Sequence, residues 1–480
     1  MCVALADLAQ VCDQIRPKIT PGPKLKADVL ARAEEIRAKV ESECVAANLP
    51  AEVRIDGSVA KDTWISKYAD VDVFMRVSPE LTKAQLRDVC LPIAKSALQP
   101  NPTAERFAEH PYIEATVRLT NQQKLRVNVV PCYNVERGQW LSATDRTPFH
   151  TEYILAHLTI PQRAEVRLLK AFMRGIGAYG ADIKTGGFSG MLCESLIASQ
   201  HDFQTVVKEF CGWQESRYID LEQYFRGRSE EVHRLFREPL IVIDPVDKGR
   251  NLAAAVRQEQ LWTFVAASRH LIAKPSTRFF GEPKTRPITA AAFRRLIGKR
   301  GPTIHAVLLG RMNVVVDVLW SQLYKTERAL VNLLEANDFH VIRSASWSNE
   351  ESLSVVLLEV QQSDLSESKK HTGPPIERIA ESVSFVNKHA KSKSTIAGPW
   401  IDGNRWVVER KRDFTSATHL LRTSLRSGGR NVGVPSEPAR CFQKRVEVLS
   451  GQSIAQLIAR NPEFSKAMKV FLSGRPPWLG

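Results

Sequence analysis

The first 150 residues alternate between helical and strand-like patterns of hydrophobic positions. Val29, Ile36, Val40 and Cys44 recur at helical spacing, with charged residues between them, and predict an amphipathic helix within 24–48. Four strand-like runs and a second helical pattern follow. The strands are predicted at 53–55, 71–77, 112–119 and 125–133, and the helix at 82–98. Such alternation predicts a small α/β or α+β domain that ends near residue 150.

The pattern then becomes mostly helical, and later mixed again. Helices are predicted at 161–180, which glycines close, and at 187–200, whereas 239–256 reads as a buried strand, a turn and a helix. A third region has strand-like runs, one helix and a turn-rich stretch. The strands are predicted at 305–310, 314–320 and 353–360, the helix at 325–337 and the turns at 368–375. We therefore expect a multidomain α+β protein, divided into residues 1–155, 156–275, 276–395 and 396–480.

The composition is that of a globular protein, with 480 residues, 43% hydrophobic and 25% charged. No apolar run approaches the ~18–20 residues that a membrane helix needs, and the amino terminus lacks the pattern of a secretory signal. The eight cysteines are scattered and none is spaced as CxxC, so neither a zinc knuckle nor a disulfide framework is predicted. A reducing cytoplasm is the expected location.

The distribution of charge along the chain indicates a candidate binding partner. The formal net charge is +15, and residues 391–480 hold 16 Lys or Arg against 6 Asp or Glu, a surplus of +10. The ordinary interpretation of a short basic run is a solvated surface. A whole basic segment instead indicates contact with a polyanion, and we expect nucleic acid.

The candidate chemistry begins at Gly57-Ser58 and continues at Asp70 and Asp72. A Gly-Ser turn that leads into a helix lets backbone amides approach phosphate oxygens. Because the two aspartates are two residues apart in a strand-like run, their side chains share one face of the strand. They repel each other unless a cation lies between them, and a divalent metal is the usual one. The alternative is an exposed strand with two solvated aspartates.

Together, the Gly-Ser turn and a DxD strand twelve to fourteen residues later are the signature of the nucleotidyltransferase superfamily. Further motifs follow in a fixed order: GSVAKDTW, EHPYIEATV, VVPCYNV, SATDRTPFHTEYI, RLLKAFMRGIGAYGADI, GFSGMLCESLI and IDPVDKGRNLAAAV. This order resembles the archaeal-type (class I) tRNA nucleotidyltransferases, the CCA-adding enzymes. The resemblance is dense over residues 50–256 and is reduced to fragments beyond them.

The resemblance implies an architecture and an activity. A palm-like nucleotidyltransferase head would occupy 1–155, a mostly helical domain that recognises the nucleotide base 156–275, an α/β body 276–395 and a basic tRNA-binding tail 396–480. The activity would be template-independent addition or repair of the 3′-terminal CCA of tRNA, from CTP and ATP, with two Mg²⁺ ions. The expected partner is the acceptor stem and T-arm of tRNA, and the resemblance leaves a homodimer open.

The resemblance also assigns residues to roles. Ser58 and Lys61 match positions that contact the triphosphate, and Asp70 and Asp72 match two of three metal carboxylates. The other matches are His150, Lys170 and Tyr179 as nucleotide contacts, and Arg250 as the reader of the base edge.

Lys170 and Tyr179 are nine residues apart and would lie on opposite sides of an unbroken helix. Both can face one ligand only if Gly175 and Gly177 end or bend that helix, which is what we expect.

The third metal carboxylate of the family lies in a pattern such as VDVVPCY, whereas this chain has LRVNVVPCY with Asn128 at that position. An amide oxygen coordinates Mg²⁺ but carries no full charge. We therefore expect triphosphate binding to persist and activation of the tRNA 3′-hydroxyl to weaken, unless Glu114 or Asp56 replaces the missing carboxylate.

Two alternatives stay open. One is a catalytically impaired form of the same scaffold, natural or engineered, that binds tRNA and nucleotide. The other is a poly(A) polymerase-like or small-molecule nucleotidyltransferase. Its small-molecule version poorly explains the basic carboxy-terminal segment.

Overall fold

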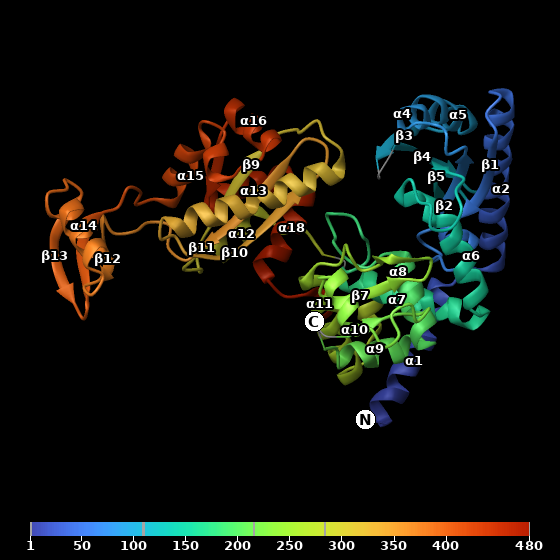
Figure 1. Cartoon of the computed structure of the whole chain (residues 1–480), viewed down its shortest axis with the longest axis horizontal. Helices are drawn as coiled ribbons and strands as arrows, with labels where there is room; N and C mark the ends of the chain where they lie inside the picture. Colours follow the sequence, from blue (N-terminus) through green and yellow to red (C-terminus); the bar gives the residue numbers. More distant parts are fainter. Residues whose placement is uncertain (1, 108–110, 215–216, 283–284, 480) are drawn as a thin grey trace. The chain divides into compact units, whose positions relative to one another are not determined.

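The computed structural model describes residues 2–107, 111–214, 217–282 and 285–479 (Figure 1). The motif EHPYIEATV begins at residues 109 and 110, which lie outside the described residues. The chain forms two compact units, residues 1–284 with 475–480, and residues 285–474. Both contain helices and sheets, so the predicted multidomain α+β class is confirmed.

A five-stranded sheet in the order β1-β2-β5-β4-β3 organises the amino-terminal part. Only β2 and β5 are parallel; the other neighbours are antiparallel. The strands are β1 (Ala51–Asp56), β2 (Asp70–Val77), β3 (Thr103–Phe107), β4 (Pro111–Arg118) and β5 (Lys124–Tyr133). The four predicted strands are confirmed, whereas β3 was missed because its sequence, TAERF, lacks an apolar alternation.

One face of this sheet is buried against helices. Val71 and Val73 of β2 belong to the same core as Val29 and Ile36 of α2 (Pro23–Ala46). The predicted helix at 82–98 is confirmed as one helical stretch. Its parts are α4 (Lys83–Gln85), the π-helical turn η1 (Leu86–Cys90) and α5 (Leu91–Ala97). Because side chains alternate along a strand, the residues between these valines point to the opposite face.

The rest of this unit is mostly helical, around a core that includes Leu169 and Phe172. Its helices are α1 (Cys2–Ile19), α6 (Thr147–His157), α7 (Ile160–Ile176), α8 (Gly190–Gln200), α9 (Phe203–Cys211), α10 (Ser229–Leu235), α11 (Gln258–Ala273) and the short 3₁₀ turns η2 (Ala143–Arg146), η3 (Thr277–Phe280) and η6 (Pro477–Leu479). The predicted helices that correspond to α7 and α8 are confirmed.

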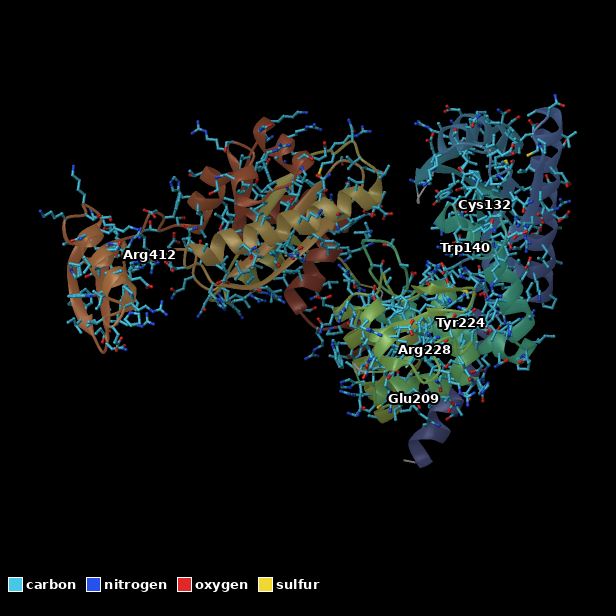
Figure 2. All side chains as sticks on the ribbon, viewed as in Figure 1. Cys132, Trp140, Glu209, Tyr224, Arg228 and Arg412 are labelled. Carbon is cyan, nitrogen blue, oxygen red and sulfur yellow. The ribbon has the colours of Figure 1, made fainter. Side chains whose placement is uncertain are left out.

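A small three-stranded sheet lies in the same unit, in the order β6 (Tyr218–Ile219), β7 (Ile241–Asp244) and β8 (Asp247–Asn251). The strand predicted within 239–256 is therefore confirmed, but the helix predicted after it is wrong. The chain turns back at Pro245 and pairs β8 with β7. Tyr224, labelled in Figure 2, holds this turn, since its hydroxyl donates to the Pro245 carbonyl at 2.6 Å.

The second unit contains a four-stranded sheet in the order β10-β11-β9-β15. The strands are β9 (Thr303–Leu309), β10 (Val341–Ser348), β11 (Ser354–Val360) and β15 (Glu447–Ser450). The helices are α12 (Ala290–Ile297), α13 (Val316–Ala336), α15 (Ala417–Leu425), α16 (Ser436–Lys444), α17 (Ala455–Arg460) and α18 (Pro462–Ser473), with the turns η4 (Arg430–Val432) and η5 (Gly451–Ile454).

The strand predicted at 314–320 is wrong, because most of it forms the first turns of α13. Leu319, Trp320 and Leu323 are buried at helical spacing. An apolar run of this length fits a buried strand or a buried helix equally well, and the helix pattern that follows it decides the outcome.

A small module with its own sheet completes this unit. Its strands are β12 (Ser368–Pro375), β14 (Arg405–Lys411) and β13 (Thr395–Asp402), in that order, and its helix is α14 (Ile379–Ala390). The stretch 368–375 was predicted as turns, and this was wrong because β14 supplies it with a pairing partner. Lys369 and Arg412 both pair with Asp338 at the end of α13 (Arg412 is labelled in Figure 2).

The predicted boundary at 395 falls at the first residue of β13, and β15 lies in the sheet that contains β9. The four-part division stays a prediction. Within the described residues, no helix combines the length and the apolar character needed to cross a membrane.

Candidate functional site

The two carboxylates of β2 lie on the sheet face that is turned away from the core. Asp70 and Asp72 are partly exposed, whereas Val71 and Val73 between and beyond them are buried. Gly57 follows β1 and begins the short helix α3 (Gly57–Ala60) beside them, with a φ of +74°. A Cβ atom there would lie 2.3 Å from Asp72 Oδ2, so only glycine lets the chain pass this close to the carboxylate.

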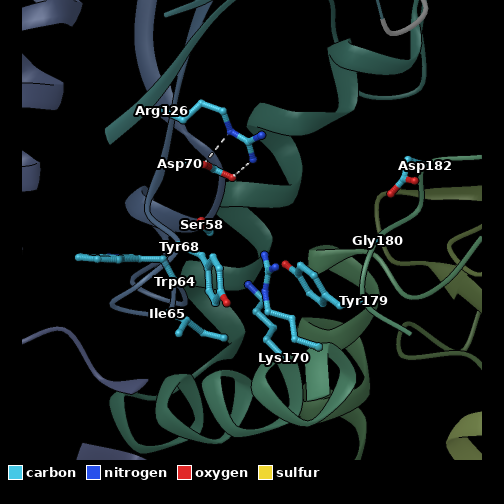
Figure 3. Close-up of a pocket in the computed structure, with 11 residues that line it drawn as sticks. Ser58, Trp64, Ile65, Tyr68, Asp70, Arg126, Lys170, Tyr179, Gly180 and Asp182 are labelled. Carbon is cyan, nitrogen blue, oxygen red and sulfur yellow. Dashed lines mark hydrogen bonds and ion pairs between the residues drawn. The ribbon is translucent and has the colours of Figure 1, made fainter. Parts of the chain in front are cut away.

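Strand β5 places a hydrogen-bond donor opposite each carboxylate. Asp70 is the register partner of Arg126, and Asp72 is the partner of Asn128. Arg126 Nε donates to Asp70 Oδ1 at 2.8 Å, and Arg126 Nη2 donates to Asp70 Oδ2 (Figure 3). Asn128 Nδ2 donates to Asp72 Oδ1 at 2.8 Å. Asn128 Oδ1 is buried and has no hydrogen-bond partner among the described residues.

The two candidate replacement carboxylates lie in one row with these residues. Across four neighbouring strands the register runs Asp56, Asp72, Asn128 and Glu114. Glu114 accepts from Arg106 Nη2 at 2.9 Å. Register thus puts both candidates in the row of Asp72 and Asn128, Asp56 beside Asp72 and Glu114 beside Asn128, and the replacement of the missing carboxylate by either stays a prediction.

Burial controls the charge state of this row. Asp56 is fully buried, with Oδ2 at 3.0 Å from Arg54 Nε, and burial raises the pKa of Asp56 above its usual value. Burial also raises the pKa of Asp72 to about 6; the hydrogen bond from Asn128 opposes this rise, and the charge of Asp70 adds to it. A cation placed between Asp70 and Asp72 would relieve both effects.

These residues fit one divalent ion better than two. Mg²⁺ is commonly bound by one or two carboxylates together with substrate phosphates, which Asp70 and Asp72 suit. In the part of the chain that the structure describes, no three His, Cys, Asp or Glu side chains are arranged to hold a metal ion. A second ion would therefore depend on the amide oxygen of Asn128.

A cavity of about 280 Å³ opens beside the carboxylates (Figure 3). It is lined by Ser58, Trp64, Ile65, Tyr68, Asp70, Arg126, Lys170, Arg174, Tyr179, Gly180 and Asp182. We call it the carboxylate cavity. Lys170 and Tyr179 both line it because α7 ends at Ile176 and Gly177 follows with a φ of +78°.

Gly175 has a different role from the one expected. It stays inside α7, and a Cβ atom there would lie 2.0 Å from the Phe279 carbonyl oxygen. Its missing side chain lets η3 pack against the helix.

Sequence reasoning missed an arginine that is stacked between two tyrosines in this cavity. The guanidinium carbon of Arg174 lies 4.1 Å from the ring centre of Tyr68 and 4.3 Å from that of Tyr179. Both distances are within the range of a cation–π contact. Arg174 follows Lys170 by one helical turn, so the spacing on α7 was a usable signal. The approach of Tyr68 was not readable from the sequence.

Lys61 and Lys170 meet at a buried acid. Lys61 Nζ lies 2.5 Å from Glu194 Oε2, and Lys170 Nζ lies 2.9 Å from Glu194 Oε1. Thr63 Oγ1 donates to the same carboxylate at 2.5 Å. Burial alone would raise the pKa of Glu194, but the two lysines outweigh it and lower the pKa to about 2. Lys170 reaches the cavity wall, whereas Lys61 is held behind it.

His150 and Arg250 meet at a second buried acid. His150 Nε2 lies 2.9 Å from each oxygen of Asp244, and Arg250 Nη1 donates to Asp244 Oδ2 at 3.0 Å. His150, the backbone N–H of Val246 and Arg250 together outweigh the effect of burial, so the pKa of Asp244 lies below its usual value. Arg250 lines another cavity, of about 470 Å³, that includes Ala181 and Ser189. Of the predicted nucleotide contacts, Ser58, Lys170 and Tyr179 thus line one cavity and Arg250 lines the other, whereas the buried Lys61 and His150 line neither.

The chain is similar to known proteins over almost its whole length. Residues 164–281 match the family model described as tRNA nucleotidyltransferase, second domain, and residues 300–451 match CCA-adding enzyme, C-terminal domain. The CCA-adding enzyme of Halobacterium salinarum (strain ATCC 29341 / DSM 671 / R1) is 32% identical over 470 residues, 98% of this chain and 99% of that protein. That of Methanosarcina acetivorans is 34% identical over 464 residues, 96% of each chain.

Among solved structures, the poly(U) polymerase Cid1 with Mg 3′-dATP bound is 11% identical, with a TM-score of 0.43. The match covers 57% of this chain and 98% of that one.

Proposed function

The chain belongs to the family of archaeal-type CCA-adding enzymes, and we propose that it adds or repairs the 3′-terminal CCA of tRNA from CTP and ATP, without a template. The observation that carries this proposal is similarity over the whole chain, 32% identity across 98% of its length. The lining of the carboxylate cavity supports it, since carboxylate, arginine and lysine side chains line the same cavity.

We propose that the triphosphate binds in the carboxylate cavity. Arg126, Lys170 and Arg174 supply positive charge there, and Ser58 supplies a hydroxyl and a backbone amide. The pair of lysines and Glu194 carries a net charge of +1, so this buried cluster attracts phosphate even though its donors are occupied. The stack of Arg174 between two tyrosines holds its guanidinium in place.

Asp70 and Asp72 are the residues that we propose hold Mg²⁺. The bound ion would supply positive charge to the triphosphate and lower the pKa of an attacking hydroxyl. The second ion of the expected pair would have Asn128 in place of a carboxylate. We propose that His150 and Arg250 contact the part of the nucleotide that lies beyond its triphosphate. Arg250 would read the base from the second cavity.

Asn128 is the residue that should limit the rate. Losing ~3–5 kcal/mol of transition-state stabilisation would slow nucleotidyl transfer by roughly a hundred- to several-thousand-fold. The catalytically impaired form of the scaffold is therefore the second candidate function, and the hydrogen bond from Asn128 to Asp72 favours it, because this amide presents its nitrogen to the carboxylate.

The test is single-turnover incorporation of labelled CMP and AMP into tRNA that lacks its CCA end. The chain would be compared with Asn128→Asp, with Mg²⁺ present. Asn121→Asp, at an exposed turn in the same domain, is the matched control. Similar rates for the chain and Asn128→Asp would support an active enzyme. Binding of CTP and tRNA without incorporation, restored by Asn128→Asp, would support the impaired form. Use of ATP but not CTP by both would overturn CCA addition in favour of a poly(A) polymerase-like activity.

We propose that the acceptor stem and T-arm of tRNA bind to basic surfaces of residues 391–480, where 16 Lys or Arg face 6 Asp or Glu. Phosphate contacts release counterions, so the affinity for tRNA should fall steeply as salt rises. A slope near zero in a plot of log affinity against log salt would contradict this. A cytoplasmic location and a homodimer stay predictions, and cell fractionation and light scattering test them.

A further inference from the structure

Arg126 contacts both carboxylate oxygens of Asp70, the atoms through which Asp70 would coordinate a metal ion. The two residues are partners across parallel strands, so their side chains leave the sheet on the same face. Two parallel N–H groups of the guanidinium meet the two carboxylate oxygens. This bidentate geometry is the strongest that an arginine and a carboxylate form, and the guanidinium stays charged at all accessible pH values.

The surroundings keep Arg126 in this position. Glu114 Oε2 lies 3.9 Å from Arg126 Nη1, and Arg106 holds Glu114 from the other side. About half of the Arg126 side chain remains exposed, and it lines the carboxylate cavity together with Ser58 and Lys170. Arg126 therefore touches Asp70 and also borders the space in which a triphosphate would bind.

The neighbouring position strengthens the argument. Two residues along the same strand, Asn128 donates one hydrogen bond to Asp72 Oδ1 with its amide nitrogen. Three of the four carboxylate oxygens of Asp70 and Asp72 thus accept from β5, whereas a site built for metal alone would leave these oxygens to the ion.

We propose that the Arg126 guanidinium occupies Asp70 in place of a divalent ion when the chain binds nucleoside triphosphate, so that this binding needs no divalent metal and free divalent metal binds weakly. The Mg²⁺ that we propose for the chemical step would then have to displace Arg126 from Asp70. The inference rests on the proposed function in one respect, the location of the triphosphate in the carboxylate cavity. A guanidinium neutralises phosphate charge by hydrogen bonding. It does not activate a hydroxyl as a metal ion does, so Arg126 contributes to binding and not to the chemical step.

The experiment measures binding by the full chain in two ways. Titration calorimetry gives the affinity for CTP in EDTA and in saturating Mg²⁺, and electron paramagnetic resonance gives the affinity for Mn²⁺ without nucleotide. The variant is Arg126→Gln, and the matched control is Arg118→Gln, an exposed arginine on β4. Arg126→Lys keeps the charge and loses the bidentate geometry, and it decides the question if Arg126→Gln does not fold.

We expect the unchanged chain to bind CTP in EDTA. Arg126→Gln should lose at least about tenfold of that affinity and gain at least about tenfold in affinity for Mn²⁺. Arg126→Lys should gain affinity for Mn²⁺ as well, because a lysine holds Asp70 through one contact. Arg118→Gln should match the unchanged chain in both assays.

The proposal is overturned if CTP binding requires Mg²⁺ in the unchanged chain, or if neither Arg126 variant gains affinity for Mn²⁺. These outcomes are separable from failure of the proposed function. CCA addition with strictly metal-dependent CTP binding would retain the function and remove the inference. Metal-independent CTP binding without CCA addition, even by Asn128→Asp, would retain the inference and remove the function.

Discussion

Asp70 and Arg126 are partners in the parallel register of β2 and β5, and both oxygens of the carboxylate accept hydrogen bonds from the guanidinium. The strand that would complete a set of acidic metal ligands instead presents a cation and an amide. Strand β5 therefore brings one positive side chain and one neutral side chain to the two carboxylates of β2.

Removing the buried charge of Glu194 should destabilise the protein strongly. Glu194→Gln leaves Lys61 and Lys170 buried without a counter-charge, and breaking such a cluster costs about 3–5 kcal/mol. Urea unfolding measures the change. Glu152→Gln removes a largely exposed acid that pairs with Arg54 and should change the unfolding free energy by less than about 1 kcal/mol. Equal losses of unfolding free energy in Glu194→Gln and Glu152→Gln would contradict the prediction that the buried charge of Glu194 stabilises the protein.

Truncating Arg174 should weaken nucleotide binding without unfolding the protein. Arg174→Ala removes the guanidinium that Tyr68 and Tyr179 hold at the cavity wall, and a hydrogen bond from such a charged group to a phosphate contributes about 1.5 kcal/mol. The dissociation constant for CTP should therefore rise roughly tenfold. Arg163→Ala, also on α7 but outside the carboxylate cavity, serves as the control. An unchanged constant in Arg174→Ala would show that the stack does not face the nucleotide.

Gly57 should not tolerate alanine. The new Cβ atom would lie 2.3 Å from Asp72 Oδ2, and the backbone has a φ of +74°. A left-handed conformation alone costs a side chain about 1–2 kcal/mol, and the clash would also displace the carboxylate. We expect Gly57→Ala to lower both the melting temperature and the affinity for Mn²⁺. Gly281→Ala places its Cβ in open space at a φ of −123° and should leave both unchanged.

Stability should fall in mild acid because His305 is buried. Burial lowers the pKa of His305 from 6.5 to about 4, which means that the folded protein resists protonation there while the unfolded chain does not. The contribution of His305 is complete above pH 6.5 and is lost as the pH falls toward 4, by up to about 3 kcal/mol.

Urea titrations followed by tryptophan fluorescence across this pH range test the prediction. His305→Gln keeps a polar side chain near Ser363 and Thr418 but cannot titrate, so its stability should depend less steeply on pH. Parallel pH profiles for the two proteins would assign the loss to other groups.

The sequence predicted the face of the sheet that carries the carboxylates, because alternation is a local property of one strand. It also located Asn128 through its motif. The same alternation, applied to β5, would have placed Arg126 beside Asn128, so this residue was within reach of sequence reasoning and was overlooked.

Other features depend on partners that are distant in the chain. The stacking of Arg174 needs Tyr68, and the burial of Lys61 needs Glu194, neither of which any local pattern indicates. The start of α13 was misread for a related reason, since an apolar run takes its secondary structure from the elements that pack against it.

One short segment links the two cavities described above. Gly180 and Asp182 line the carboxylate cavity, whereas Ala181 between them lines the cavity of Arg250. Three consecutive residues of one segment thus contribute to both cavities. A substitution within residues 180–182 that reshapes one cavity should therefore reshape the other as well.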